Sequence, residues 1–567
     1  MGDQVLTLDV GPSILLSSLM DEIRFVEIIN ESLVWDQQRC GLSPGTRIKA
    51  MVLNILCQGN PLYKVDEFFE KQDVELLFGS GVSAGQLNDD ALGRALDYLY
   101  EAVPWKVYTP LALSALDRLG LKLGLLHNDT TSFSVYGEYI PDKDPDPESS
   151  RRLSVTYGYS KEHRPDLKQI VLGMGVTPER IPILAKMEDG NTSDVKWNMD
   201  FIQKLRDSLR EEDWSNLLYQ ADSALVTKEN LDGLKVHGLD FLSRIPDTFG
   251  LSSELKTRAW EEGNWQNAGK LSSKKDAAQY RYQAYEQELE GNTYRFLVVH
   301  SDQLEKQKAK RLETDVQKEH ANLTKSFEKL GATVFHCVED AQKAKEAFEK
   351  KHKAKLHEYH LEISSSEEPV KRNRRGRPKK EEQAQTTMVY RIVVKSLEEN
   401  HGMIEHKLRL MGTFILMTNR MDRSKLPDLD MLTAYKGQSA AETRFRLLKE
   451  SQMIDAIFVK TPKRIEALGI VYVMALLVYG MLEYRIRLEM KTQEKPLILK
   501  GKRKLFEPTG KAILEQLNDI RMIVIQQGGQ TMRFLPDNIG DQTKRLVSLA
   551  GYDMSIYVSK HHEKVNA

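Results

Sequence analysis

Two aspartates stand among apolar residues in segments that alternate like β-strands. Asp129 lies in "LLHNDTTSFSVYG" and Asp222 in "LLYQADSALVTKENL". A carboxylate in apolar surroundings is costly unless a partner stabilises its charge. Taken singly, each aspartate is more often a cap or turn residue, so the pair gains chemical meaning only from a further partner.

A third acid lies in "YKGQSAAETRFRLLKESQ", which has the periodicity of one amphipathic helix. Five of its side chains recur at offsets of 3, 4, 4 and 3: Tyr435, Gln438, Glu442, Arg446 and Lys449. On a helix they share an arc of about 80°. The ordinary explanation is an i,i+4 ion pair of Glu442 with Arg446, which stabilises a helix by only about 0.2–0.5 kcal/mol. The alternative is that Glu442 joins the two aspartates.

Three carboxylates brought together would need cations. Carboxylates about 4 Å apart repel by about 4 kcal/mol per pair at an effective dielectric constant near 20. Oxygen ligands of this kind select Mg²⁺ or Mn²⁺. Two such ions about 3.5–4 Å apart form the clamp used for in-line displacement at phosphorus. The acids therefore predict a metal-dependent site for phosphodiester chemistry.

The elements that would position these acids follow from the hydrophobic periodicity. Short β-like runs dominate residues 121–222, where three strands, a helix and a fourth strand predict an α/β arrangement. Residues 435–485 are expected to hold the acidic helix and a following core helix. Mainly helical regions are expected at residues 1–120 and 486–567.

The long segment 223–434 mixes strands with two unusual stretches. A Lys-, Glu- and Ala-rich helical hairpin is expected at 303–363, and its charges are typical of a solvated face. A basic loop with the composition of an exposed disordered segment is expected at 364–385.

Composition narrows the class of protein. The 567 residues predict several domains, and 81 basic against 82 acidic residues give a net charge of −1. Binding to nucleic acid must therefore come from local patches. Three widely spaced cysteines argue against a disulfide framework or zinc site and favour a reducing cytoplasm. The apolar run 467–482 is more typical of a core helix than of a membrane span, so no membrane partner is expected.

The spacing Tyr435-x2-Gln438-x3-Glu442-x6-Lys449 resembles the Y-(2)-R-(3)-E-(6)-K signature of DDE transposases of the insertion-sequence-four superfamily. The chain departs from it at Gln438, where the family has arginine. Four more segments are similar to blocks of its sixteen-thirty-four branch: "GYSKEHRPDLKQIVLG" (158–173), "DGNTSD" (189–194), "YQADSALVTKENL" (219–231) and "FLSRIP" (241–246).

The resemblance implies an RNase H-like catalytic core with a long mixed α/β insertion at 223–434. It implies a catalytic triad of Asp129, Asp222 and Glu442 that holds two Mg²⁺ or Mn²⁺ ions. The implied activity is binding of terminal inverted repeats, strand cleavage and strand transfer into target DNA. Two ends must meet, so a homodimer is expected in the synaptic complex.

Further residues are candidates for DNA contact. By resemblance, Tyr435 and Lys449 would contact DNA near the cleaved strand, Gln438 would bond a phosphate without adding charge, and Arg446 would add a phosphate contact or pair with Glu442. The remaining candidates are basic: Lys161, His163 and Arg164 in "GYSKEHRPDLKQ", Arg244 in "LSRIP", and Arg375 and Arg377 in "KRNRRGRPKK". The last stretch looks like an AT-hook, which enters the minor groove of A·T-rich DNA.

Two other functions remain open from the sequence. A nuclease that cuts without joining would share the metal site. A catalytically silent DNA-binding protein derived from a transposase would depend on the basic loop instead.

Overall fold

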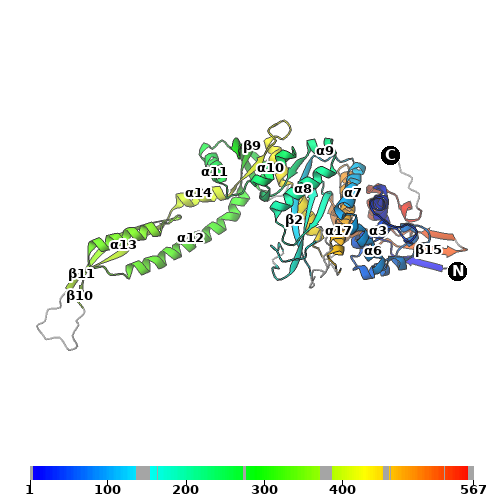
Figure 1. The fold of residues 1–567 in the computed structure, drawn as a ribbon, viewed down its shortest axis with the longest axis horizontal. Coiled ribbons are helices and arrows are strands. Elements are labelled where there is room, and N and C mark those ends of the chain that lie inside the picture. The colour runs from blue at the N-terminus through cyan, green and yellow to red at the C-terminus, as the bar shows by residue number, and fades with distance from the viewer. Residues whose placement is uncertain are drawn as a thin grey trace, which may run out of the picture. The chain divides into compact units, whose positions relative to one another are not determined.

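The computed structural model describes residues 4–135, 153–161, 164–272, 276–370, 386–450, 459, 461–528 and 530–559. The chain forms two compact units. The first comprises Met1–Ser243, Thr418–Leu426 and Asp430–Ala567, and the second Arg244–Met417 and Pro427–Leu429. Helices and strands occur in both, as the α/β prediction requires (Figure 1).

Five strands in the first unit follow the order β4-β3-β2-β5-β6. Their bounds are β2 (Leu125–Val135), β3 (Lys168–Val176), β4 (Pro182–Glu188), β5 (Leu218–Gln220) and β6 (Asp240–Arg244). Strands β2, β3 and β4 pair antiparallel, whereas β5 pairs parallel with β2 and β6. Helix α8 (Asp194–Ser208) separates β4 from β5 along the chain. The expected order of three strands, a helix and a fourth strand is confirmed.

Helix α8 packs on β3 because two glycines make room for its aromatic residues. Trp197 and Phe201 are one helical turn apart and fully buried. A Cβ atom at Gly173 would overlap the Trp197 ring, and one at Gly175 would lie 2.7 Å from Phe201. The Ser193 side chain caps the helix by accepting from the Lys196 amide. Short helices α9 (Glu211–Asn216), η3 (Ser223–Leu225) and α10 (Lys228–Val236) flank β5.

The N-terminal helices enclose a long apolar helix from late in the chain. They are α1 (Ser13–Glu22), α2 (Phe25–Ser32), α3 (Pro44–Cys57), η1 (Leu62–Lys64), α4 (Val65–Phe69), α5 (Val74–Phe78), η2 (Ala84–Leu87), α6 (Asp89–Glu101) and α7 (Pro104–Leu119). Helix α17 (Pro462–Met490) packs against α1, α3, α6 and α7. It is long and apolar enough to cross a membrane, but its whole apolar window is buried within the fold. This burial agrees with the prediction of a core helix at 467–482.

The prediction of a mainly helical region at 486–567 is wrong in part. Helices α18 (Gly510–Leu517) and α19 (Asp541–Leu549) and short turns η4 (Lys500–Lys502) and η5 (Met554–Tyr557) are joined by strands β13 (Leu497–Leu499), β14 (Arg503–Leu505), β15 (Met522–Gln527) and β16 (Gln530–Phe534). Strand β1 (Gln4–Leu8), also missed in the helical prediction for 1–120, pairs antiparallel with β15. The first and last parts of the described chain are thus joined in one small sheet.

The second unit contains strands in the order β12-β9-β8-β7 and a separate hairpin. Its elements are α11 (Gly250–Glu262), β7 (Gln266–Lys270), β8 (Gln279–Leu289), β9 (Asn292–Ser301), α12 (Asp302–Gly331), α13 (Val338–Lys351), β10 (His357–Pro369), β11 (Thr386–Glu399), α14 (His401–Met411) and β12 (Thr413–Thr418). The helical hairpin ends at Lys351, before the predicted 363, because 357–369 pair as a strand with β11. The predicted loop at 364–385 therefore begins inside β10.

Candidate active site

Asp129 lies on β2, and Asp222 follows the end of β5, the parallel strand next to it. Strands β2 and β5 pair with His127 opposite Gln220. Each aspartate lies two residues further along, and side chains two residues apart on a strand share a face. Asp222 lies just beyond β5, where its side chain accepts a hydrogen bond from the Ala224 amide at 3.0 Å. The register thus brings the two predicted acids near each other, beside the C-terminal end of β5.

Burial raises the pKa of both carboxyl groups. The pKa of Asp129 rises from 3.8 to about 6, chiefly by burial, with further increases from the charges of Asp222 and Asp194. The Lys161 ammonium and the Thr130 amide oppose this rise. Burial and the Asp194 carboxylate raise the pKa of Asp222. We call Asp129, Asp194 and Asp222 the acidic cluster, because their charges influence one another.

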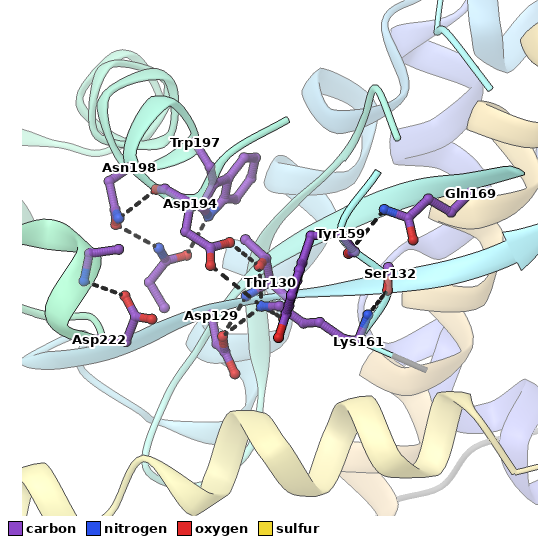
Figure 2. A network of polar contacts seen from close by, with 12 residues as sticks. Asp129, Thr130, Ser132, Tyr159, Lys161, Gln169, Asp194, Trp197, Asn198 and Asp222 are labelled. Carbon is purple, nitrogen blue, oxygen red and sulfur yellow. Dashed lines mark hydrogen bonds and ion pairs between the residues drawn. The ribbon is translucent and has the colours of Figure 1, made fainter. Parts of the chain in front are cut away.

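Lys161 supplies a positive charge to the acidic cluster. Its Nζ atom donates to the Thr130 carbonyl oxygen at 2.9 Å and to Thr130 Oγ1 at 2.7 Å. The same atom lies 3.9 Å from Asp129 Oδ1 and 3.7 Å from Asp194 Oδ2. Thr130 Oγ1 in turn donates to Asp194 Oδ1 at 2.5 Å. Figure 2 shows these side chains converging from β2, the start of α8 and the segment before β3.

A second polar network anchors the start of α8 on the sheet. The Asn128 amide group donates to the Tyr219 hydroxyl at 2.6 Å, and that hydroxyl donates to Asn198 Oδ1 at 2.7 Å. The Trp197 indole donates to Asn128 Oδ1 at 3.3 Å (Figure 2). All four side chains are buried. The network fixes the helix end that carries Asp194.

The predicted single helix over 435–452 is broken at its start. Helix α15 (Asp428–Lys436) ends before Gly437, and α16 (Ser439–Leu448) begins two residues later. Gly437 allows close packing at the break, because a Cβ atom there would lie 3.2 Å from the His127 ring. Gln220 Nε2 donates to the Tyr435 carbonyl oxygen at 3.1 Å. These contacts with β2 and β5 favour the break over a continuous helix.

Helix α16 runs along β2 on the face that carries Asp129. Its N-terminal end contacts His127 through Gly437, and the Lys449 ammonium beyond its C-terminal end lies 5.6 Å from the Phe133 ring centroid. Six strand residues span about 20 Å, and twelve helical residues span about 18 Å. The two elements therefore have similar lengths between these two contacts. Linear interpolation between the contacts places Glu442 beside Asp129 along the strand. In Figure 2 the Asp129 carboxylate points toward the yellow helix of this segment.

Glu442, the third predicted acid, is not part of a metal site in the described arrangement of side chains. Glu442 is exposed on α16. Among the residues that the structure describes, no three His, Cys, Asp or Glu side chains converge closely enough to hold a metal ion. The donors near Asp129 nevertheless suit a hard cation, because the Lys161 ammonium is already bound there by carboxylate, carbonyl and hydroxyl oxygens. The position fits a cation, and Glu442 would join it only if its side chain turned toward the cluster.

The other residues predicted to contact DNA lie in several different surroundings. Arg446 is exposed on α16, while Gln438 and Tyr435 are half-buried at the break. Arg164 and Arg244 form ion pairs with Asp166 and Asp247, each at 2.8 Å. His163, Arg375 and Arg377 lie outside the described residues. Lys161 is partly exposed, and its ammonium group lies against the acidic cluster.

Comparisons with known proteins give little beyond the N-terminal region. A family model described as "Domain of unknown function (DUF4277)" matches residues 7–113, which include none of the acids. No curated protein matches the chain. A solved structure described as a "piggyBac transposase synaptic complex with hairpin DNA" aligns at 11% identity with a TM-score of 0.34, covering 89% of this chain and 79% of that one. A TM-score this low does not establish a common fold.

The contribution of Asp194 was missed from the sequence. In "DGNTSD" it resembles an ordinary helix-capping residue, and Ser193 beside it does cap α8. The only available signal was that this acid begins a helix directly after the third strand, at the edge where Asp129 was expected. The sequence contains nothing that pairs Asp194 with Thr130 or Lys161.

Proposed function

We propose that this chain is a DDE-type DNA transposase, which cleaves DNA strands with the help of divalent ions and transfers them to target DNA. One observation carries the proposal: α16 contacts β2 at both ends, at His127 and at Phe133, and Asp222 follows the parallel strand next to β2. Interpolation between the two contacts places Glu442 beside Asp129. Two strand-borne acids and one helix-borne acid can then face a single phosphodiester.

The sheet order supports an RNase H-like core. In such a core three antiparallel strands are followed by a helix and two strands parallel to the first, in the spatial order 3-2-1-4-5. Strands β2 to β6 have this order and these directions. The second unit follows β6 in sequence, and the chain returns to α15 and α16 after it. An insertion before the catalytic helix accounts for this path.

In the proposed reaction, Asp129, Asp222 and Glu442 would hold Mg²⁺ or Mn²⁺. Bound ions would activate the attacking hydroxyl and stabilise the leaving oxygen at phosphorus. The raised pKa values of both aspartates are consistent with carboxylates that need a cation to remain ionised in a buried position. Lys449 and Arg446 lie on the acidic helix and would contact phosphates of the strand being cut.

DNA is the proposed partner, in the form of terminal inverted repeats and a target duplex. A homodimer would bring two ends together. Because the net charge is only −1, local groups such as Arg446, Lys449 and the basic loop would provide the attraction.

The deciding experiment compares cleavage and joining by Glu442→Gln and Glu450→Gln proteins. Labelled DNA carrying the inverted ends that flank the coding sequence is incubated with target plasmid and Mg²⁺. Glu442→Gln should bind the ends normally but lose nicking and joining by about 10³-fold, equivalent to about 4 kcal/mol. Glu450 lies just beyond the C-terminal end of α16 and pairs with Lys511 at 3.4 Å, away from the aspartates, so its variant should remain active.

Two outcomes would favour the other functions. Metal-dependent cutting without joined products would indicate a nuclease. If the native chain and Glu442→Gln bind DNA equally and the native chain cuts none in Mg²⁺ or Mn²⁺, the protein is a catalytically silent DNA-binding protein.

A further inference from the structure

Lys161 places an ammonium group where the acidic cluster would bind a divalent ion. Its two hydrogen bonds to Thr130 and its approaches to Asp129 and Asp194 use hard oxygen atoms. These are the same types of ligand that Mg²⁺ and Mn²⁺ prefer. The Lys161 ammonium therefore lies among the types of oxygen ligand that a divalent ion would use.

The side chains of Ser132 and Gln169 hold the backbone of Lys161 and of the residues before it. The Lys161 amide donates to Ser132 Oγ at 3.0 Å. Upstream, Gln169 Nε2 donates to the Tyr159 carbonyl oxygen at 3.1 Å and to the Gly190 carbonyl oxygen at 2.6 Å. A Cβ atom at Gly158 would overlap the Gly190 backbone, so this close packing requires glycine. These contacts direct Lys161 toward the acids, although its side chain remains 34% exposed.

Building on the proposed function, we propose that Lys161 is the resident counter-cation of the acidic cluster and is displaced when a divalent ion binds Asp129. The two cations cannot share the position, because like charges about 4 Å apart repel strongly in a partly buried site. Lys161 thus lowers the metal affinity of the DNA-free protein and reduces the repulsion between the half-buried carboxylates of the cluster.

A cleft beside the acidic cluster can accommodate the displaced Lys161 side chain. This cleft of about 370 Å³ is lined by Lys161, Tyr159, Gly190 and Asp194, among others. Tyr159 is 86% exposed, so the cleft opens to solvent. There the ammonium would gain a phosphate of bound DNA as its new partner. Metal binding and DNA binding would therefore strengthen each other, as linkage requires.

The first test measures Mn²⁺ binding by the full, DNA-free chain. Lys161→Met should tighten the dissociation constant by about tenfold or more. The control is Lys500→Met, since Lys500 is similarly exposed at 40% and pairs with Asp519 at 2.7 Å outside the cluster. That variant should bind Mn²⁺ like the native chain. Equal or weaker binding by Lys161→Met would overturn the role of Lys161 but not the proposed function.

A second test uses the native chain and does not depend on the folding of a variant. Pulse acetylation of amines, read by mass spectrometry, should modify Lys161 several-fold faster with Mn²⁺ present, relative to Lys500 in the same sample. An unchanged or slower rate overturns the displacement. If neither the native chain nor Lys161→Met binds Mn²⁺, the metal centre of the proposed function fails, and the role of Lys161 fails with it.

Discussion

Asp129 must be ionised to bind a metal ion, yet its surroundings favour the protonated carboxyl. Burial sets the direction of the pKa shift, and the neighbouring carboxylates reinforce it against the opposing charge of Lys161. Replacing Asp129 should therefore stabilise the metal-free fold while it removes function. Such an opposition between stability and activity is expected at sites built around clustered charges.

Asp129→Asn should raise the free energy of unfolding at pH 7 without metal. The folded-state pKa of about 6 exceeds the reference value of 3.8, so the folded state holds the proton more tightly. The contribution of the protonated Asp129 carboxyl to the stability of the native chain is complete below about pH 4 and is lost as the pH rises to about 6. Above that, the variant should be more stable by about 1–3 kcal/mol. Urea unfolding in EDTA across this range measures the difference.

Its control is Asp166→Asn, in an exposed ion pair with Arg164, which should change stability little. Added Mn²⁺ should stabilise the native chain and not Asp129→Asn. A native chain as stable as Asp129→Asn at pH 7, with the same pH dependence, would contradict the electrostatic assignment.

At the scale of elements, two features fix α16 relative to the sheet and the core. The glycine at the α15–α16 break allows contact with His127 on one side. On the other side, fully buried Arg444 donates to Glu483 of α17 at 3.0 Å and to the Arg180 carbonyl oxygen at 2.7 Å. The helix that carries Glu442 is thus held between β2 and α17.

Gly437→Ala should reduce cleavage more than DNA binding. The added Cβ atom would lie 3.0 Å from the Ala434 carbonyl oxygen and 3.2 Å from the His127 ring, so the break must shift by a few tenths of an ångström. Such a shift changes the position of Glu442 along β2 relative to Asp129. Gly85→Ala is the control, because no atom lies within 4 Å of its added Cβ. Equal cleavage rates for the two variants would refute this function of the break.

Arg444→Met should lower the free energy of unfolding by roughly 3 kcal/mol, because it leaves the buried Glu483 carboxylate with less compensation. The exposed pair of Arg503 with Glu515, 2.9 Å apart, is the comparison, and Arg503→Met should cost less than about 1 kcal/mol. Chemical denaturation of both variants measures the difference. Equal losses would show that the Arg444 pair adds nothing beyond a surface contact.

At the scale of the whole molecule, the near-neutral charge means that the proposed DNA affinity must come from local basic segments. The densest of these is "KRNRRGRPKK" at 371–380, outside the described residues. It follows β10 and precedes β11 in the second unit, whereas the acidic cluster belongs to the first. The proposed DNA affinity and the proposed chemistry therefore belong to different parts of the chain.

Replacing Arg375 and Arg377 together by alanine should weaken DNA binding and its salt dependence. Each lost phosphate contact should reduce the log–log salt slope by about 0.9. Titrations of labelled duplex at several salt concentrations measure the slope. Alanine at Lys350 and Lys351, exposed at the end of α13, should leave it unchanged. An unaltered slope in the double arginine variant would exclude the basic loop from DNA contact.

Much of the first sheet could be predicted from the sequence, because alternating apolar residues with a helix between them have few alternative arrangements. The break at Gly437 could not, since it depends on the packing of His127 from a distant strand. The strands at 522–534 were missed although "QQGGQ" is a recognisable turn between them. The contact of Lys161 with the acidic cluster could not be predicted from the sequence either, because a charged segment before a strand usually faces solvent.

The enclosure of α17 by the N-terminal helices has a consequence for synthesis on the ribosome. Helix α7 ends at Leu119, and α17 is complete only at Met490, roughly 370 residues later. At typical rates of translation this delay lasts about 20–70 s. During that time the apolar faces of α3, α6 and α7 lack their central partner, so the nascent chain is a natural client for chaperones.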